Sequence, residues 1–391
     1  MRLDAEKWRA KRGVERILKA LGSQDGLTRY VGGAVRDDLL GLPVSDIDFA
    51  TRLHPQEVIE RLEKAHIKAA PTGIEHGTIT AVADGQPAEV TTLRADVSTD
   101  GRRATVAFTD DWMADASRRD FTINALYADP EDGEVHDYFG GLDDLQARRV
   151  RFIGDPLVRI AEDHLRILRF FRFHARFGAG EPDAAAIAAC TARANDLMAL
   201  RRERIADELL KLLGLADPTA TAALMIDRGI LKPVVPEIDS ADRLEALVRA
   251  EADGAFGPDP LRRLAALLPR DPETAEKVAA RLKLSNKARR RLALSADGDL
   301  SANARSLAYW IGTESAADRL LLAGRTEDAA AIRDWPAPKL PITGGGLIKR
   351  GIAQGPLVAK TLQAIERQWV AAGFPGGEAF EAIVAEAVAA A

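Results

Sequence analysis

Two aspartates, Asp46 and Asp48, lie at the start of an apolar segment that ends at Thr51. If this segment is a strand, both side chains leave the same face, because successive residues of a strand point to opposite sides. Two neighbouring carboxylates offer the hard oxygen ligands that Mg²⁺ uses when it bridges phosphates. An isolated Asp-x-Asp pair is more often part of a solvated surface loop, so the pair needs support from other residues.

A glycine turn before the aspartates gives that support. Gly32 and Gly33 lack a Cβ, so the backbone N–H groups there can approach a ligand closely. Residues 34–40 are predicted to begin a helix directly after the turn, and the N-terminal end of a helix attracts phosphate. Arg36, in the first turn of that helix, offers a forked donor for a triphosphate. The glycine turn and the acidic pair together indicate nucleotidyl transfer.

Further charged residues fit the same chemistry. In the segment RRDFTINAL, Arg119 is a candidate phosphate ligand, and Asp120 is placed to orient it or to assist a metal. A surface ion pair is the ordinary alternative for these two residues. Glu89 becomes a third acidic group, as a metal ligand or a proton acceptor, if its predicted strand neighbours the strand of the aspartates. An exposed strand carboxylate is an equally good interpretation of Glu89.

An arginine-rich stretch follows. Residues 148–176 contain eight Arg and no Lys. The periodicity predicts one long helix from Pro156, with an apolar face and an opposite charged arc. That arc carries Glu162, Arg166, Arg169, Arg172 and Arg176. A solvated face is the ordinary interpretation, but arginine predominates where phosphates or planar base edges are gripped.

The sequence patterns around these residues predict an α+β fold. The patterns predict a leading helix over 1–21, a helix over 55–65, a long loop over 95–117, and strands over 27–31, 46–51, 77–83, 88–94 and 135–139. A small mixed sheet with helices is therefore expected over residues 1–150, and mostly helix beyond residue 178. We expect a catalytic head at 1–150, a helical neck at 151–240 and a helical body and tail at 241–391.

Composition limits the function classes. The chain has 391 residues, 47% hydrophobic and 29% charged, with a formal net charge of −5. This length predicts two to four domains. The single cysteine, Cys190, excludes an intrachain disulfide. Residues 1–21 are charged and amphipathic, unlike a signal peptide, and no apolar run approaches the roughly 20 residues of a membrane helix. A cytoplasmic protein without membrane contact is expected.

Several motifs occur in an order typical of one family. They are GGAVRD at 32–37, DID at 46–48, RRDFTINAL at 118–126, EDHLR at 162–166 and ERIADELLKLL at 203–213. This pattern resembles the class II nucleotidyltransferases of the DNA polymerase beta superfamily, namely CCA-adding tRNA nucleotidyltransferases and bacterial poly(A) polymerases. The resemblance covers about residues 28–240. The last motif departs from the family, because Arg201 stands where the family has Ser, and we interpret this helix as structural.

The resemblance implies a fold, a reaction and a set of site residues. It implies a polymerase-beta-like head followed by helical parts, and Mg²⁺-dependent addition of C, C and A to the tRNA 3′ end from CTP and ATP. Asp46 and Asp48 would hold the metal, with Glu89 as a third catalytic carboxylate. The residues implied to bind the nucleotide are Gly32, Gly33, Arg36, Arg119, Asp120, Glu162, Asp163, Arg166, Arg169 and Arg172. The helical remainder would hold the tRNA, mainly through its phosphates.

The segment EDHLR also suits base selection on chemical grounds. Cytosine and adenine both present an amino donor beside a ring acceptor, whereas uracil and guanine present a carbonyl beside a ring N–H. A carboxylate acceptor, Asp163, beside a guanidinium donor, Arg166, therefore matches C and A and rejects U and G. No nucleic-acid template would be needed.

Other interpretations stay open at this point. A poly(A) polymerase shares every motif, and a CC-only or A-only tRNA nucleotidyltransferase is a third possibility. An RNA-binding protein with an inactive transferase domain is opposed by the intact DID and RRD segments. A small-molecule nucleotidyltransferase would leave the arginine-rich stretch and the long helical tail without a purpose. The basic tract that includes Lys287 is either a solvated face or an RNA contact.

Overall fold

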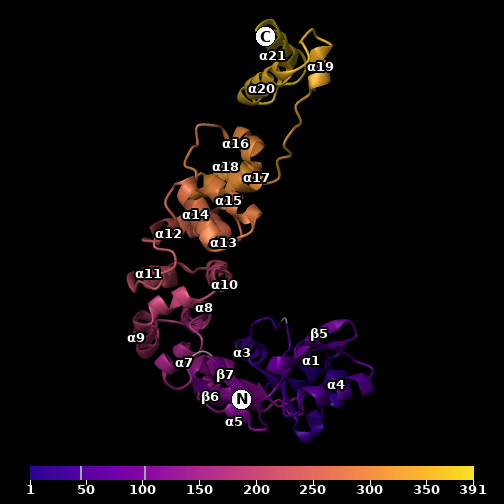
Figure 1. Ribbon diagram of the computed structural model, residues 1–391, viewed down its shortest axis with the longest axis vertical. Helices are drawn as coiled ribbons and strands as arrows, with labels where there is room; N and C mark the ends of the chain where they lie inside the picture. The colour runs from indigo at the N-terminus through magenta and orange to yellow at the C-terminus, as the bar shows by residue number, and fades with distance from the viewer. Residues whose placement is uncertain (45, 101–102) are drawn as a thin grey trace. The chain divides into compact units, whose positions relative to one another are not determined.

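The computed structural model describes residues 1–44, 46–100 and 103–391. The chain forms two compact units, one of Met1–Glu208 with Asp227–Val234 and one of Leu209–Ile226 with Val235–Ala391. The first unit contains all the described strands, and the described part of the second is helical (Figure 1). This confirms the α+β class. The division into head, neck, and body with tail stays a prediction.

A mixed seven-stranded sheet forms the centre of the first unit. Its strand order is β3-β4-β5-β2-β1-β8-β9. Strands β2 and β5 pair in parallel and the other neighbours pair antiparallel. The strands are β1 Thr28–Val31, β2 Phe49–Thr51, β3 Lys68–Gly73, β4 Thr78–Ala83, β5 Gln86–Thr92, β8 Leu126–Ala128 and β9 Val135–Asp137. The predicted mixed sheet is therefore confirmed.

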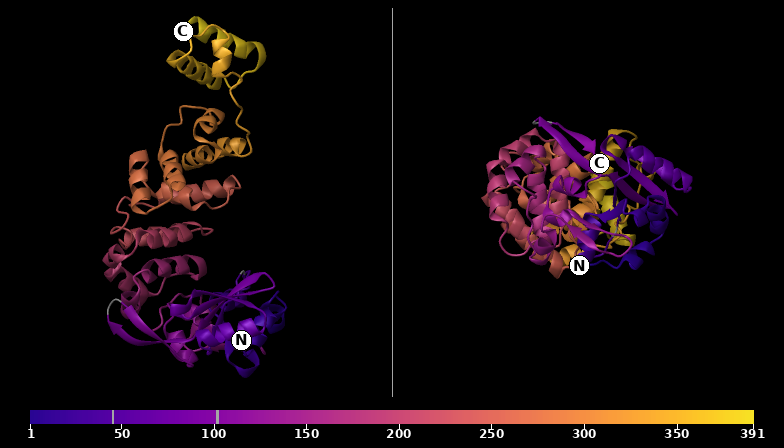
Figure 2. Two further views of the ribbon diagram at one scale, coloured as in Figure 1. Left: turned by 45° about the vertical axis from the view of Figure 1, so that its right-hand side comes forward. Right: turned by 90° about the horizontal axis from the view of Figure 1, so that it is seen from below.

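The first unit also contains helices, which Figure 2 shows together with the sheet. They are α1 Ala5–Arg9, α2 Val14–Ala20, α3 Gly33–Leu39, α4 Pro55–Lys64, α5 Trp112–Ser117, α6 Gly141–Gln146, α7 Pro156–Glu162, α8 Arg166–Phe177 and α9 Ala184–Ala192. The predicted single leading helix is wrong, because Gly13 separates α1 from α2. Gly13 has φ 81°, and a Cβ there would lie 2.6 Å from the carbonyl oxygen of Ala83.

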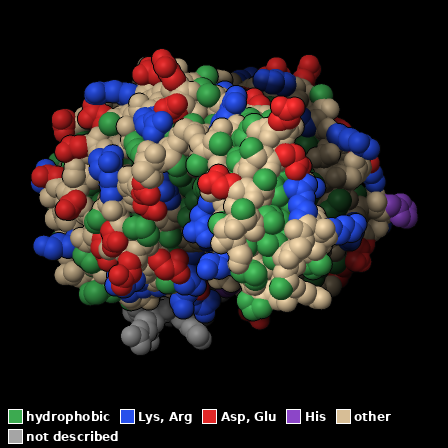
Figure 3. Space-filling view, turned by 90° about the horizontal axis from the view of Figure 1, so that it is seen from above, with side chains coloured by type: hydrophobic (Ala, Val, Ile, Leu, Met, Phe, Trp, Pro, Cys, Tyr) green, Lys and Arg blue, Asp and Glu red, His purple; other side chains and the backbone are tan. Residues whose placement is uncertain are grey.

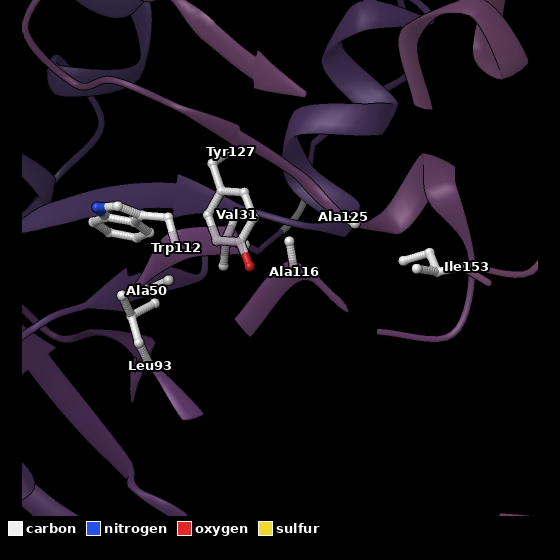
Figure 4. Packing of buried hydrophobic residues seen from close by; sticks show 8 residues of the cluster. All are labelled: Val31, Ala50, Leu93, Trp112, Ala116, Ala125, Tyr127 and Ile153. Carbon is white, nitrogen blue, oxygen red and sulfur yellow. The ribbon is translucent and has the colours of Figure 1, made fainter. Parts of the chain in front are cut away.

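A buried apolar cluster includes side chains of the neighbouring strands β1, β2 and β8 (Figure 4). The rings of Trp112 and Tyr127 meet edge to face, with centroids 5.5 Å apart. Val31 and Ala50, from neighbouring strands β1 and β2, complete the contact together with Leu93. Burial of this cluster fixes the sheet register, because a slip of one residue would turn the apolar side chains to the opposite face.

Two predicted elements near the acidic residues are wrong in extent. Strand β2 begins at Phe49, so Asp46 and Asp48 lie in the segment before it. Residue 45, which precedes them, lies outside the described residues. The predicted loop over 95–117 instead contains a two-stranded ribbon, β6 Arg94–Asp100 with β7 Arg103–Phe108, and helix α5. Residues 101–102 of that predicted loop lie outside the described part of the chain.

The predicted long helix from Pro156 is also wrong. Asp163 has an extended backbone, with φ −152° and ψ 107°, and separates α7 from α8. Its Oδ1 accepts a hydrogen bond from the backbone N–H of Leu165 at 3.1 Å. A short acidic side chain that bonds to the backbone two residues on competes with the helix, which explains the break.

The second unit is a series of packed helices. Helix α10, Arg202–Leu213, begins in the first unit and ends in the second. The others are α11 Thr219–Asp227, α12 Asp242–Asp253, α13 Pro260–Leu267, α14 Pro272–Arg281, α15 Asn286–Ala296, α16 Ala304–Ile311, α17 Thr313–Leu322, α18 Thr326–Ile332, α19 Gly344–Ile348, α20 Pro356–Ala371 and α21 Gly377–Ala389. Within the described residues, no helix combines the length and the apolar character that crossing a membrane requires.

Charged side chains occur both inside and outside this helical unit. Glu251 is buried between Arg262 and Arg263, at 2.7 and 2.8 Å. Arg262 also bonds to buried Asp318 at 2.8 Å. On the surface, acidic and basic side chains are intermixed across the face shown in Figure 3. The side chain of Lys287 is exposed on the surface of this unit.

Candidate active site

A cavity of about 620 Å³ in the first unit collects most of the predicted site residues. The predicted residues that line it are Gly32, Gly33, Arg36, Asp48, Glu89, Arg119, Asp120, Asp163, Arg166 and Arg169. Sequence reasoning missed seven others, namely Val31, Thr91, Arg94, Asp115, Arg118, Asn124 and Phe173. Asn124 belongs to the RRDFTINAL segment, so that motif already contained the signal that could have identified it.

Acidic side chains gather at one edge of the cavity. Strands β2 and β5 are parallel with Phe49 opposite Val90, so the preceding residues, Asp48 and Glu89, are neighbours across the sheet. Burial, followed by the charges of Glu89 and Asp46, raises the pKa of Asp48 to about 6, while Arg119 opposes the shift. The strand of Glu89 therefore neighbours the segment of the aspartates, as the sequence pattern required for a third acidic group. The negative charges of these carboxylates repel one another.

This donor set fits a hard cation. Like charges held together are stabilised by a bound cation, and carboxylate oxygens are the ligands that Mg²⁺ prefers. Among the described residues, no group of three or more acidic, histidine or cysteine side chains is arranged to hold a metal ion by itself. An incomplete protein shell is typical of Mg²⁺ sites that take their remaining ligands from water and substrate phosphates. The assignment of Asp46 and Asp48 as metal ligands stays a prediction.

The glycine turn lies beside the acidic edge. Gly32 has φ 72° and ψ −126°, a backbone region that other residues rarely adopt. A Cβ on Gly32 would lie 3.2 Å from Nη1 of Arg119. The turn thus lets a guanidinium come close to the backbone at the start of α3. Gly33 is partly exposed and lines the cavity, as a phosphate-binding backbone requires.

Arg36 lines the cavity but is held by the protein. Its Nε donates to Oδ1 of Asp37 at 2.7 Å, and its Nη1 donates to Oδ1 of Asn124. The guanidinium also lies over the ring of Phe177, with its carbon 4.0 Å from the ring centroid. Burial lowers the pKa of Arg36, although Asp37 opposes this. A contact of Arg36 with triphosphate stays a prediction.

Arg119 is fixed by two partners. Its Nε donates to the hydroxyl of Tyr127 at 3.1 Å, and its Nη2 lies 3.3 Å from Oδ2 of Asp115. The Tyr127 hydroxyl itself donates to Oδ2 of Asp115 at 2.6 Å. Burial opposes the charge, but Tyr127 and Asp115 outweigh it and raise the pKa of Arg119. Arg119 is therefore an oriented, permanently charged group at the cavity wall.

Asp120 pairs with the arginine-rich helix. Its Oδ2 accepts from Nε and Nη2 of Arg169 at 2.7 and 2.5 Å. Its Oδ1 accepts from the Phe121 backbone and from Nδ2 of Asn124, both at 2.9 Å. Burial opposes the charge, yet Arg169 and Asn124 lower the pKa of Asp120. A role of Asp120 toward triphosphate or metal stays a prediction, whereas its hold on Arg169 is observed.

Asp163 and Arg166 both reach the cavity, from the break between α7 and α8 and from the first residue of α8. Oδ2 of Asp163 accepts from Nη2 of Arg204 at 2.7 Å. Arg166 donates from Nη1 to the Arg159 carbonyl at 2.8 Å and from Nη2 to the Arg118 carbonyl at 3.1 Å. The acceptor and the donor are thus positioned by the protein, although they do not share one helix.

Three predicted site residues lie outside the cavity lining, namely Asp46, Glu162 and Arg172, and the last two support this arrangement. Glu162 lies between Arg159, at 2.8 Å, and Arg166. Arg172 donates to Oε2 of Glu208 on α10 at 2.6 Å. Glu208 and Arg204 both belong to the segment ERIADELLKLL, which therefore contacts Arg172 on α8 and Asp163 in the break before it.

Comparison with known proteins identifies the family. Residues 28–151 match the family described as "Poly A polymerase head domain", and residues 181–242 match "Probable RNA and SrmB- binding site of polymerase A". The mitochondrial CCA tRNA nucleotidyltransferase 1 of Mus musculus is 33% identical over 381 residues, which cover 93% of this chain and 87% of that protein. The chain belongs to the CCA tRNA nucleotidyltransferase family. It is accordingly a nucleotidyltransferase.

Other members of the CCA tRNA nucleotidyltransferase family agree in sequence and fold. The CCA-adding enzyme of Limosilactobacillus fermentum is 33% identical over 363 residues, covering 87% of this chain and 88% of that protein. The crystal structure of the Bacillus stearothermophilus CCA-adding enzyme in complex with CTP matches with a TM-score of 0.72 and 26% identity, covering 93% and 94% of the two chains. The Thermotoga maritima enzyme complexed with tRNA shows the same fold, with a TM-score of 0.70 and 22% identity.

Proposed function

We propose that this protein adds C, C and A to the 3′ end of tRNA, using CTP and ATP and no nucleic-acid template. The observation that carries the proposal is the composition of one cavity. An acidic edge at Asp48 and Glu89 shares it with an oriented acceptor and donor at Asp163 and Arg166. The names of the relatives, which are CCA-adding enzymes of animals and bacteria, support this choice of product.

The proposed reaction is a nucleotidyl transfer. The 3′-hydroxyl oxygen of the RNA attacks the α-phosphorus of the nucleotide, and the bond from that phosphorus to its bridging oxygen breaks. Pyrophosphate leaves, and the hydroxyl proton passes to a base, for which Glu89 is our candidate because it is exposed beside Asp48. Asp46 and Asp48 would hold Mg²⁺, which neutralises phosphate charge and lowers the pKa of the attacking hydroxyl when bound.

The remaining residues bind the nucleotide in this proposal. The backbone at Gly33 and the guanidinium of Arg119 hold the triphosphate, because both line the cavity near the acidic edge. Asp163 and Arg166 read the Watson–Crick edge of the base. Their partners, Arg204 and the carbonyls of Arg159 and Arg118, limit their motion before the nucleotide arrives. Such preorganisation reduces the entropy that binding must overcome.

A bounded product is the test of this proposal. The protein is incubated with tRNA transcripts that end before CCA, after C, after CC and after CCA, with each nucleotide supplied separately. We expect C to be added to the first two transcripts, A to the third, and nothing to the fourth. Long A tails on unrelated RNA would instead show that the protein is a poly(A) polymerase, the activity named in the description of the head-domain family.

The same assay separates the partial enzymes. A CC-only enzyme would stop before A, and an A-only enzyme would use only the transcript that ends in CC.

The location of the protein in the cell is a separate question. We propose the cytoplasm, as expected from the sequence, and note that the mouse relative is named as mitochondrial. Cell fractionation followed by immunodetection tests this.

A further inference from the structure

A chain of hydrogen bonds links the helix of the glycine turn to the arginine-rich helix, and Asn124 is its central member. Nη1 of Arg36, on α3, donates to Oδ1 of Asn124. Nδ2 of Asn124 donates to Oδ1 of Asp120 at 2.9 Å. Oδ2 of Asp120 accepts from Nε and Nη2 of Arg169, on α8, at 2.7 and 2.5 Å. All four residues line the same cavity.

The chemistry of the two neighbours determines how the Asn124 amide is turned. Its oxygen faces a guanidinium, which only donates, and its nitrogen faces a carboxylate, which only accepts when ionised. The opposite orientation would place donor against donor and acceptor against acceptor. Asn124 is 8% exposed, so water is a weak competitor for either bond. An amide is the side chain that can serve both partners at once.

Asn124 thereby controls the carboxylate of Asp120. With Oδ1 held by Asn124 and by the Phe121 backbone, the plane of the carboxylate is fixed and Oδ2 faces Arg169. The side chain of Arg169 is 32% exposed, and its only other ion-pair partner among the described residues is Glu208, at the longer distance of 3.8 Å. Asp120 is therefore the closest ion-pair partner that positions Arg169, whose guanidinium carbon also lies 5.3 Å from the centroid of the Phe173 ring.

We propose that Asn124 is a positioning residue for nucleotide choice, which acts through Asp120 on Arg169 and couples Arg169 to the glycine turn through Arg36. This inference rests on the proposed function, because it assigns Arg169 to the nucleotide. Asn124 itself need not touch the substrate. Its role is to make the placement of Arg169 depend on the helix that begins at the triphosphate end of the cavity.

Asn124→Asp is the decisive variant, because it keeps the size of the side chain. It retains an acceptor for Arg36 but replaces the donor to Asp120 by a second negative charge. Single-turnover incorporation of each of the four nucleotides is measured on a tRNA that ends before CCA. We expect the KM for CTP to rise about 10- to 100-fold and the preference for CTP over UTP to fall by about tenfold, as for loss of a buried hydrogen bond. The rate at saturating CTP should change much less.

A double variant supplies the rescue. Asp120→Asn combined with Asn124→Asp exchanges the carboxylate and the amide without changing the net charge. The carboxylate at position 124 then pairs with Arg36, and the amide at position 120 donates to it and accepts from Arg169, while the bond from the Phe121 backbone N–H is lost. We expect this variant to recover part of the nucleotide preference that Asn124→Asp loses. Asn195→Asp, an exposed position in the same unit, adds the same charge and is the matched control.

The possible outcomes separate this inference from the proposed function. If Asn124→Asp lowers only the melting temperature and keeps the wild-type KM and nucleotide preference, Asn124 is structural and the inference fails. If the wild-type protein adds no C or A, the proposed function fails. In that case, the affinities of wild type and Asn124→Asp for CTP and UTP are measured by calorimetry. Equal affinities in the two proteins would overturn the inference.

Discussion

Asp163 and Arg204 form an ion pair of 2.7 Å between the break that follows α7 and the first turns of α10. Asp163 is the candidate acceptor for the base, and its other oxygen bonds to the Leu165 backbone. Arg204 and the Leu165 backbone together therefore determine which way the free electron pairs of the carboxylate point. The side chains of Asp163 and Arg204 are 35% and 46% exposed, so the pair contributes at most about 1 kcal/mol to stability.

The first prediction follows from the difference between the weak stabilisation by this ion pair and its role in orienting Asp163. Arg204→Ala should change the melting temperature little, because a half-exposed ion pair stabilises weakly. It should nevertheless reduce the preference for CTP over UTP by about tenfold, because the carboxylate of Asp163 loses its orientation. Incorporation of single nucleotides and a thermal melt measure the two effects. Arg201→Ala, at an exposed neighbouring position, should change neither. An unchanged preference in Arg204→Ala would remove Arg204 from the site.

A second prediction concerns the acidic edge. Asp46→Asn and Asp48→Asn should each reduce transfer by more than about a hundredfold without unfolding the protein, because each removes a candidate metal ligand. Primer extension in Mg²⁺ and circular dichroism are the measurements. Glu60→Gln, an exposed residue on α4, is the control for loss of a surface charge. Near-normal extension by both Asp variants would exclude the metal assignment.

The same edge predicts an unusual effect on stability. Because the pKa of folded Asp48 is raised to about 6 from the ordinary value of 3.8, its ionisation opposes folding, and this penalty grows as the pH rises from about 4 to about 6. In EDTA at pH 7.5, Asp48→Asn should therefore stabilise the protein by about 1–2 kcal/mol, seen as a higher melting temperature. At pH 4 the gain should disappear. If Asp48→Asn melts below wild type at pH 7.5, the ionised Asp48 carboxylate does not destabilise the folded protein.

Local sequence patterns selected most of the residues that line the cavity, but not how they are connected. The strand pattern over 88–94 made Glu89 a third acidic group only if its strand neighboured the aspartates, and the parallel pairing of β2 with β5 meets that condition. The break at Asp163 could not be predicted in this way. The periodicity continues through it, and the partner that holds Asp163 lies 41 residues further along the chain.

Asp120 illustrates the same limit. Its place beside two arginines in the sequence suggested that it orients Arg119 or assists a metal, but its ion-pair partner is Arg169, 49 residues away. Asn124 has no charge, so the charge pattern does not identify it, although its amide both accepts from Arg36 and donates to Asp120. Long-range ion pairs depend on how elements pack, and a single sequence records them only through the separate residues.

The last prediction concerns Arg166, whose guanidinium lies at the cavity wall. Its Nη1 and Nη2 already donate to the carbonyls of Arg159 and Arg118, which fix the plane of the fork while the side chain stays 15% exposed. Arg166→Ala removes the donor that should face the ring acceptor of cytosine or adenine. We expect discrimination of CTP and ATP over UTP and GTP to fall about 10- to 100-fold, on the order of 1–3 kcal/mol for an unmade buried hydrogen bond.

Single-turnover incorporation of all four nucleotides measures this, on tRNA that ends before CCA for CTP and after CC for ATP. Lys287→Ala, an exposed change in the other unit, should keep the base preference even if tRNA binding weakens. A selector loses the correct nucleotides more than the wrong ones, because uracil and guanine present a ring N–H, a donor, where cytosine and adenine present the ring acceptor that Arg166 is expected to meet. A phosphate contact or a structural brace, by contrast, serves every nucleotide alike. Equal slowing of all four reactions in Arg166→Ala would therefore assign Arg166 to one of those roles and leave base choice without its donor.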